Sequence, residues 1–489
     1  MPTNPSPAIT LLSPLTPPSL ERTWLSAPHP RLPFVATCSA DKTVRIYSLQ
    51  NFTLLSTISG GHKRSVRSCA WKPLVKGESV LATGSFDATV GVWRRWDGYG
   101  RGGDDDRMAV VEADAGNNDG DAHSNNEEED DEEWRFAVLL DGHDSEVKSL
   151  SWSPAGALLA TCSRDKSIWI WEDLDDGDNN FETVAVMQEH TGDVKWVSWH
   201  PTEECLASAS YDDTIRLWRE DIDDWGQVAC LRGHAGTVWC VEWESGEAEC
   251  TLPVSASVDG GEEDGEETAD ITETRRKQWI ERRTLAGPRL VSCSDDRTIR
   301  IWDKQTRPPT TSQNTGPSSM PSIIRPTDTD EKWLEQSQLP SRHDLSVYSV
   351  AWSKRSGLIA STGADGRIVV YQERFVNAEK AVEESTATNA NADMDMDTPL
   401  SPADNNIEKN DENAQSQSQS QSQPGTPAAT PRTEWHVLAM IDAAHGIYEV
   451  NHICWALRAD RGRKEGGEEE EVLISTGDDG CVKVWRLER

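Results

Sequence analysis

One spacing recurs through this chain and limits what it can fold into: an Asp followed, six residues later, by an aromatic residue. The spacing occurs seven times, each time with the Asp in a short polar turn between two apolar segments. The seven pairs are Asp41 and Tyr47, Asp87 and Trp93, Asp165 and Trp171, Asp212 and Trp218, Asp296 and Trp302, Asp365 and Tyr371, and Asp479 and Trp485. Where no insertion intervenes, successive Asp residues lie 46 or 47 positions apart. A period of this length indicates one structural unit copied along the chain.

The best preserved copy, residues 142–172, shows what each unit contains. After a Gly-His pair, residues 147–152 (VKSLSW) alternate between apolar and small or polar side chains, as a half-buried strand does. A Ser-Pro-Ala-Gly turn leads to a second apolar strand, residues 158–163 (LLATCS), and residues 167–171 (SIWIW) predict a third strand. One such unit cannot bury its own faces, so we expect it to pack against others like itself.

An upstream His accompanies six of the seven Asp residues. Five of these His residues are followed nine positions later by a Trp, whereas Trp455 follows its His after ten positions, so one residue is inserted there. The six are His62, His143, His190, His234, His343 and His445. The combination of Gly-His, Asp and terminal Trp resembles the WD40 repeat. Seven copies therefore predict an all-β, seven-bladed WD40 β-propeller with disordered acidic and low-complexity loop insertions.

The repeats predict a single domain spanning residues 1–489. A β-capable stretch at about residues 9–15 is expected to complete the last blade, which would otherwise be one strand short. Between strands the composition turns acidic or repetitive, and we expect disordered insertions there. The predicted insertions are 97–133, 250–287, 303–341, 373–433 and 459–470. Within the second of them, residues 272–283 could form a short helix. The net charge of −36 lies mostly in these insertions and argues against direct binding of nucleic acid.

Cysteine usage predicts neither a metal site nor a cofactor. The chain has ten Cys but no CxxC pair, and three of them occupy the same second-strand position in different repeats. Buried Cys in such places acts as a small apolar side chain. No apolar run approaches the ~20 residues that cross a bilayer, and the amino-terminal region lacks the basic segment of a signal peptide. A cytoplasmic or nuclear location is therefore expected.

The repeated His, hydroxyl, Asp and Trp residues invite comparison with a catalytic triad, but the repetition favours a structural role. An enzyme needs one constellation, whereas here near-copies recur in blade after blade. In WD40 blades these side chains form a hydrogen-bonded chain between the outer loop and the strands. The best-formed predicted sets are His62, Asp87 and Trp93; His143, Asp165 and Trp171; His190, Asp212 and Trp218; and His234, Asp296 and Trp302. We predict no catalytic residue and no enzyme.

Function is then expected on one face of the ring. In a blade of this type, the residue before the turn Asp and the residues flanking the first-strand Val emerge around the central channel. The turns contribute Phe86, Arg164, Tyr211 and Asp295, and the flanking positions contribute Arg67, Lys148, Asp193, Lys195, Trp239, Tyr348, Glu449 and, in blade one, Arg22 and Trp24. Basic residues beside aromatic ones are typical of protein-binding hot spots, and would also suit an acidic peptide ending in an aromatic residue. The alternative is that some of these side chains only pack against their neighbours.

Several strings resemble the WD40 protein of the cytosolic iron–sulfur protein assembly machinery. They are GHKRSVRSCAWKP, GSFDATVGVWRR, LATCSRDKSIWIWE, HTGDVKWVSWHP, LASASYDDTIRLWRED, DDWGQVACLRGH and SCSDDRTIRIW. The resemblance spans residues 61–302, weakens in blades six and seven, and fails in the acidic insertions. It implies a non-catalytic adaptor that joins a DUF59-type protein and a HEAT-repeat scaffold. This complex would bring late assembly factors to apoprotein clients of the cytosol and nucleus.

Members of the similar family have an exposed Arg in the third-blade turn SRDKS, and the resemblance implies that Arg164 is this residue. The resemblance also implies that the protein itself does not ligate an iron–sulfur cluster. Two other interpretations remain open. A WD40 ring could instead serve as a substrate receptor or scaffold in a ubiquitin-ligase or chromatin complex. A hydrolase is the third and weakest alternative.

Overall fold

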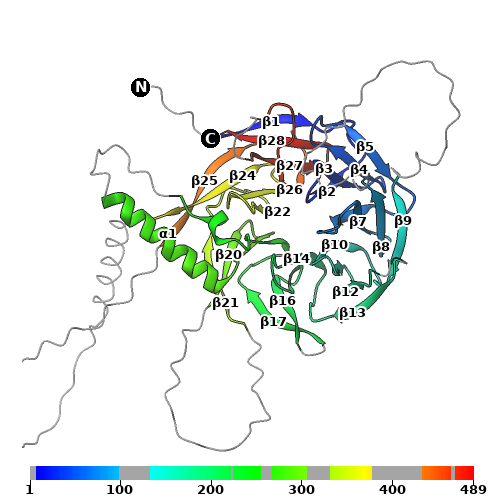
Figure 1. The fold of residues 1–489 in the computed structure, drawn as a ribbon, viewed down its shortest axis with the longest axis horizontal. Helices are drawn as coiled ribbons and strands as arrows, with labels where there is room; N and C mark the ends of the chain where they lie inside the picture. The colour runs from blue at the N-terminus through cyan, green and yellow to red at the C-terminus, as the bar shows by residue number, and fades with distance from the viewer. Residues whose placement is uncertain are drawn as a thin grey trace, which may run out of the picture.

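Seven antiparallel sheets of four strands each stand around a central axis in the computed structural model (Figure 1). The structure describes residues 7–97, 133–175, 177, 179–221, 224–254, 267–305, 331–376, 432–463 and 469–488. The prediction of an all-β, seven-bladed propeller is confirmed. Each sheet is a blade in which the first strand faces the axis and the fourth lies on the outside, as β5, β9, β13 and β17 do in Figure 1.

The first four blades follow the chain in order, with four consecutive strands in each. Blade 1 holds β2 (Thr23–Pro28), β3 (Phe34–Ser39), β4 (Val44–Ser48) and β5 (Leu54–Ile58). Blade 2 holds β6 (Val66–Trp71), β7 (Glu78–Ser85), β8 (Thr89–Trp96) and β9 (Arg135–Asp141). Blade 3 holds β10 (Val147–Trp152), β11 (Leu158–Ser163), β12 (Ile168–Asp173) and β13 (Phe181–Met187). Blade 4 holds β14 (Val194–Trp199), β15 (Cys205–Ser210), β16 (Thr214–Asp221) and β17 (Asp224–Arg232).

The last three blades include the blade that closes the ring. Blade 5 holds β18 (Val238–Trp243), β19 (Leu290–Ser294), β20 (Ile299–Lys304) and β21 (Trp333–Gln338). Blade 6 holds β22 (Val347–Trp352), β23 (Ile359–Gly363), β24 (Ile368–Phe375) and β25 (Thr433–Ile441). Blade 7 holds β26 (Val450–Leu457), β27 (Glu471–Gly477), β28 (Val482–Glu488) and, on its outer edge, β1 (Ala8–Pro14).

The amino-terminal strand closes the ring. β1 pairs antiparallel with β28, from Ala8 opposite Glu488 to Pro14 opposite Lys483, with an irregularity between Leu11 and Ser13. This pairing covers the edge of β28, which would otherwise expose a row of unpaired backbone groups.

The core lies between neighbouring blades rather than within one blade. The second strands are the most buried, and every residue of β11 and β15 is buried, whereas the outer strand β13 exposes most of its side chains. One apolar cluster joins Ile170 of blade 3 to Trp199 and Leu206 of blade 4. Because each sheet buries its faces only against the next sheet, the ring folds as one unit.

Part of the predicted insertion 250–287 is ordered, which corrects the expectation of disorder there. A short 3-10 helix covers Ala248–Thr251, and helix α1 covers Glu267–Ala286 on the outside of the ring. The ring of Trp279 is fully buried and lies 6.1 Å from that of Phe375, and Arg283 donates to Asp303 at 2.6 Å. The helix is anchored by one Trp and by ion pairs rather than by an apolar stripe, and it extends beyond the short helix predicted at residues 272–283.

The predicted insertion 303–341 also contains structure. Its carboxyl-terminal part forms β21, which pairs with β20 through Arg300 opposite Gln338 and Lys304 opposite Trp333. This strand is largely polar and none of its residues is buried, because it forms the outer edge of its blade, and its composition resembles that of a loop. The central parts of the predicted insertions, residues 98–132, 255–266, 306–330, 377–431 and 464–468, lie outside the described residues.

Candidate protein-binding face of the ring

A polar quartet, made of a His, a Ser or Thr hydroxyl, an Asp and a Trp of one blade, connects loop to strands. In blade 3, His143 Nδ1 lies 2.9 Å from Asp165 Oδ2, and His143 Nε2 lies 2.9 Å from Thr161 Oγ1. Trp171 Nε1 donates to the same hydroxyl at 3.0 Å. The His and Trp are buried, so every polar atom of the quartet is used within the fold.

The same arrangement recurs around the ring. In blade 4, His190 bonds Asp212 and Ser208 at 2.9 and 2.7 Å, and Trp218 donates to Ser208 at 2.9 Å. The equivalent residues are His62, Thr83, Asp87 and Trp93 in blade 2, His234, Ser292, Asp296 and Trp302 in blade 5, and His445, Ser475, Asp479 and Trp485 in blade 7. In blade 6 the aromatic residue is Tyr371.

The quartets hold their Asp residues in the charged form. Burial by itself raises the pKa of Asp165, but hydrogen bonds from His143 and Ser167 outweigh it and hold this pKa well below its ordinary value. The pKa of Asp212 is lowered in the same way by His190 and Thr214. The loops that carry the His and the turns that carry the Asp together form one face of the ring, here called the top face.

Trp24 organises the top face at blades 1 and 2. The guanidinium carbons of Arg22 and Arg67 each lie 5.0 Å from the centroid of the Trp24 ring, and the ring of Phe86 lies 5.9 Å away. Lys148 Nζ lies 4.6 Å from the Phe86 centroid. These distances are within the range of cation–π attraction, so the five predicted side chains form one continuous cluster.

Glu146 links this cluster to Arg164. Its carboxylate lies 3.9 Å from Lys148 Nζ and 3.3 Å from Arg164 Nη1. Glu146 was not among the predicted site residues, although it precedes the first-strand Val of blade 3 just as the predicted Asp193 does in blade 4. The Arg164 side chain stays 59% exposed despite this contact. Its positive charge is therefore available to a partner.

A second group of predicted residues surrounds Lys195 on blades 4 to 6. Lys195 Nζ lies 5.3 Å from the Tyr211 centroid and 5.2 Å from the Trp239 centroid. Trp239 meets Tyr348 edge-on at 5.3 Å, and Asp193 lies 3.2 Å from Lys195. Tyr211 is 61% exposed, whereas the other side chains of this group are half-buried or pack against one another.

The mouth of the channel concentrates positive charge in a restricted space. Burial lowers the pKa of Lys148 to about 8, with Glu146 opposing the shift and Lys195 adding to it. Burial also lowers the pKa of Arg67 to about 10. A negatively charged partner would stabilise the charged forms of Lys148 and Arg67, and this attraction would offset the cost of their desolvation.

Two further top-face acids already have hydrogen-bond partners. Asp295 accepts a hydrogen bond from Ser346, and Glu449 interacts with the hydroxyl of Tyr348. Deeper in the channel, Trp196 stacks on His452 at 5.6 Å, a contact across the ring that no sequence pattern indicated.

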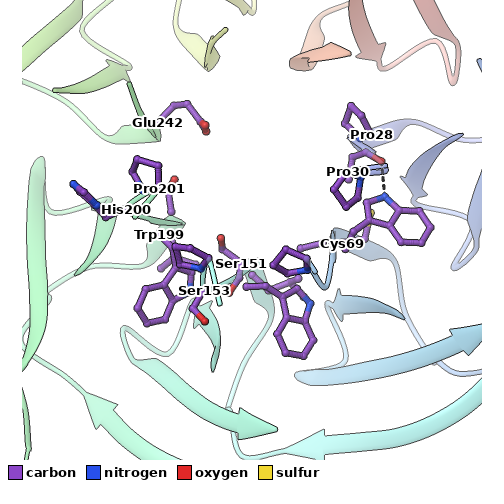
Figure 2. Close-up of a pocket in the computed structure, with 18 of the residues that line it drawn as sticks. Pro28, Pro30, Cys69, Ser151, Ser153, Trp199, His200, Pro201 and Glu242 are labelled. Carbon is purple, nitrogen blue, oxygen red and sulfur yellow. Dashed lines mark hydrogen bonds between the residues drawn. The ribbon is translucent and has the colours of Figure 1, made fainter. Parts of the chain in front are cut away.

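The opposite mouth of the channel is hollowed into a cavity of about 410 Å³ (Figure 2). It is lined by the carboxyl ends of the inner strands, including Trp71, Trp152 and Trp199, and by prolines such as Pro30 and Pro201. No predicted site residue lines it. Within the described ranges, no group of three or more His, Cys, Asp or Glu residues is arranged to hold a metal ion. No helix in this part of the chain combines the length and apolar character needed to cross a membrane.

Comparison with known proteins agrees with this architecture. The WD domain, G-beta repeat family matches residues 23–48, 52–94, 134–172, 181–219, 284–303 and 335–372. A protein of Aspergillus flavus named "Probable cytosolic iron-sulfur protein assembly protein 1" is 60% identical over 488 residues, which cover 99% of each chain.

Two further relatives carry the same name. The protein of Penicillium rubens is 59% identical over 501 residues, covering 99% of this chain and 100% of the relative. The protein of Aspergillus clavatus is 61% identical over 503 residues, covering 100% of both. These three matches cover essentially the whole chain. The chain belongs to the WD-repeat family of cytosolic iron-sulfur protein assembly protein 1.

Proposed function

We propose that this protein is a non-catalytic scaffold of cytosolic iron–sulfur protein assembly, which brings assembly factors to apoprotein clients in the cytosol and nucleus. The observation that carries the proposal is the full-length similarity to proteins named for that process. The recurring polar side chains of the ring also hydrogen-bond to one another, which favours a structural role for them over a catalytic one. Partners of DUF59 type and of HEAT-repeat type, together with late assembly factors, follow from the family resemblance.

The top face is the proposed recognition surface for these proteins. Arg164 is exposed, and it stands beside a cluster of cations held against aromatic rings. Aromatic and Arg side chains contribute most of the binding energy in many interfaces, because they fill well-packed, desolvated pockets near the centre of the interface. Arg164, Arg22 and Tyr211 supply exposed contacts, and the half-buried Trp24, Phe86 and Trp239 hold the surface in shape.

Reversal of one charge tests the recognition surface. Arg164→Glu is expected to weaken association with clients or assembly factors by about ten-fold or more, because the new carboxylate faces Glu146 and repels an acidic partner. The matched control is Arg276→Glu, since Arg276 is an exposed Arg on α1, outside the ring. Co-purification is measured beside thermal melting. Unchanged co-purification with an unchanged melting temperature would remove Arg164 from the surface.

Depletion tests the process itself. Loss of the protein is expected to lower the activity of cytosolic and nuclear iron–sulfur enzymes while mitochondrial ones keep theirs. Equal loss in both compartments, or no loss in either, would contradict the proposed function. Capture of ubiquitin-ligase or chromatin components in place of assembly factors would favour the alternative of a general WD40 receptor.

A further inference from the structure

The first loop of blade 7 is one residue longer than its counterparts. In blades 2 to 6 the first-strand Val stands four positions after the quartet His, whereas Val450 stands five positions after His445. When the loops are aligned on this Val, Ile447 occupies the position that holds a polar or small residue in blades 2 to 6. Those residues are Lys63, Asp144, Thr191, Ala235 and Asp344.

The insertion breaks a clamp that the other blades share. In each of them the backbone N–H after the quartet His donates to the quartet Asp, over distances of 2.7 to 3.1 Å. In blade 7 the residue after His445 is Gly446, whose φ is +69° and whose N–H donates to Ala443 O at 2.9 Å. The backbone of this loop therefore departs from the path of its counterparts and does not make their hydrogen bond to the quartet Asp.

This longer loop presents apolar side chains to solvent. Ile447 is 95% exposed and Tyr448 is 48% exposed, although the loop is held by backbone hydrogen bonds such as Ala444 N–H to Gly366 O at 2.9 Å. An isoleucine side chain that is almost wholly in water contributes no burial energy to the fold. Exposed apolar side chains that gather in one patch are typical of an interaction site.

Neighbouring loops add two more exposed apolar residues. Leu345, aligned with Tyr448 in blade 6, is 52% exposed, and Leu20, before blade 1, is 93% exposed. The blade 6 turn joins the first two loops, because Ala364 N–H bonds Ser346 O and Gly366 lies close to Tyr448 O. We call Leu20, Leu345, Ile447 and Tyr448 the apolar top patch.

The last loop of blade 7 extends the connection to Leu20. Ser19 N–H donates to Gly480 O at 3.0 Å, and Asp478 N–H donates to Glu449 O at 3.1 Å. The four apolar residues therefore stand on consecutive loops of blades 6, 7 and 1. They lie on the same face as Arg164, over the other side of the ring from blade 3.

Carboxylates exceed cations around this patch. Asp344 and Asp442, both exposed, share the guanidinium of Arg367 at 2.7 and 2.8 Å, and Asp365 lies 3.8 Å from the same guanidinium. The further carboxylates beside the patch are Glu21, Glu449 and Asp478. The further cations are Arg22, Arg342 and Lys483. Arg22 lies 3.4 Å from Asp478, Arg342 is exposed, and Lys483 donates a hydrogen bond to Ala444 O. This surface favours a partner with positive charge beside its apolar side chains.

We propose that the apolar top patch is a second docking surface, which binds a segment of another protein presenting bulky apolar side chains flanked by Lys or Arg. Its chemistry is complementary to that of the Arg164 surface, which suits acidic partners. The two surfaces therefore give one face of the ring two different recognition chemistries. This inference is independent of the cellular process proposed above.

Site-specific photocrosslinking identifies the occupant. Ile447 is replaced by p-benzoyl-phenylalanine in the full chain, expressed in the cells of origin, and the crosslinked peptides are sequenced. The matched control carries the same photoprobe at Leu74, a 72% exposed residue at the other end of blade 2. The expected product joins position 447 to an apolar, Lys- or Arg-containing segment of another protein, and this product is absent from the control.

A synthetic peptide with the crosslinked sequence then measures affinity by fluorescence anisotropy. Ile447→Asp and Tyr448→Asp should each weaken binding by about ten-fold or more, while Leu74→Asp and Arg164→Glu leave it unchanged. The proposal is overturned if position 447 crosslinks only to this chain's own segments, to a second copy, to an acidic segment or to nothing. Equal binding by wild type and Ile447→Asp would overturn it as well. Enzyme activities after depletion test the proposed function separately.

Discussion

Replacement of Arg289 by Met should destabilise the ring more than any surface change, because Arg289 is the centre of a buried ion network. Its guanidinium bonds Glu244 at 2.7 and 3.0 Å and Glu373 at 2.8 and 3.0 Å. The Arg side chain is fully buried, and the two carboxylates are 2% and 4% exposed. The network joins blade 5 to blade 6 beneath helix α1.

The expected loss follows from what Arg289→Met leaves behind. Two buried carboxylates would lose their shared cation, and removing one partner of a buried pair costs about 3–5 kcal/mol in the free energy of unfolding. The pKa of Glu244 is now held below its ordinary value, since attraction and hydrogen bonds from Arg289 outweigh the effect of burial. Without Arg289, burial dominates, so this pKa should rise and the variant should bind protons on folding.

Urea unfolding followed by Trp fluorescence measures the loss, and hydrogen exchange of α1 reports whether the helix detaches. Arg276→Met is the matched control: this exposed residue of α1 should change the free energy of unfolding by less than ~0.5 kcal/mol. Adding Glu244→Gln and Glu373→Gln to Arg289→Met should recover part of the loss, because no buried charge then remains unpaired. A loss below about 1 kcal/mol for Arg289→Met alone would refute the reasoning.

Three further predictions concern pH, the quartets and ring closure. Burial lowers the pKa of His452 to about 3, against about 6.5 unfolded, so its contribution to stability is present above pH 6.5 and lost as pH falls. His452→Gln should flatten the fall in unfolding free energy between pH 6.5 and 4 by up to ~1.4 kcal/mol per pH unit; an unchanged slope would contradict this. Thr161→Val should cost about 1–3 kcal/mol in urea unfolding, because His143 and Trp171 lose their shared partner, and the exposed Thr183→Val should cost little. Deleting residues 1–14 should lower the melting temperature and cause aggregation by opening β28, and a monodisperse product with an unchanged melting temperature would disprove that role.

Much of the fold could be read from local patterns. The seven Asp–aromatic pairs predicted the number of blades, because each pair marks one unit with its own strands and turn. The quartet residues were also predictable, since their positions relative to the strands repeat. The top-face positions follow from the same register. Whether those side chains are exposed does not follow from it: Arg164 and Tyr211 are exposed, whereas Trp24 and Trp239 are half-buried against their neighbours.

Contacts between distant segments were decided only by the tertiary structure. Helix α1 has no strong apolar stripe. It is ordered because Trp279 packs against Phe375 of blade 6 and against Arg289, and because Arg283 pairs with Asp303 of blade 5. The strand β21 has the composition of a loop and forms because β20 offers an edge.

The one-residue insertion after His445 was visible in the sequence, but its consequence was not. Only the backbone path of the loop shows that Ile447 is raised into solvent rather than packed on the blade. The physical reason is general: repeated local patterns encode what every blade does alike. The structural effect of a departure from the repeat depends on which surfaces the closed ring places beside it.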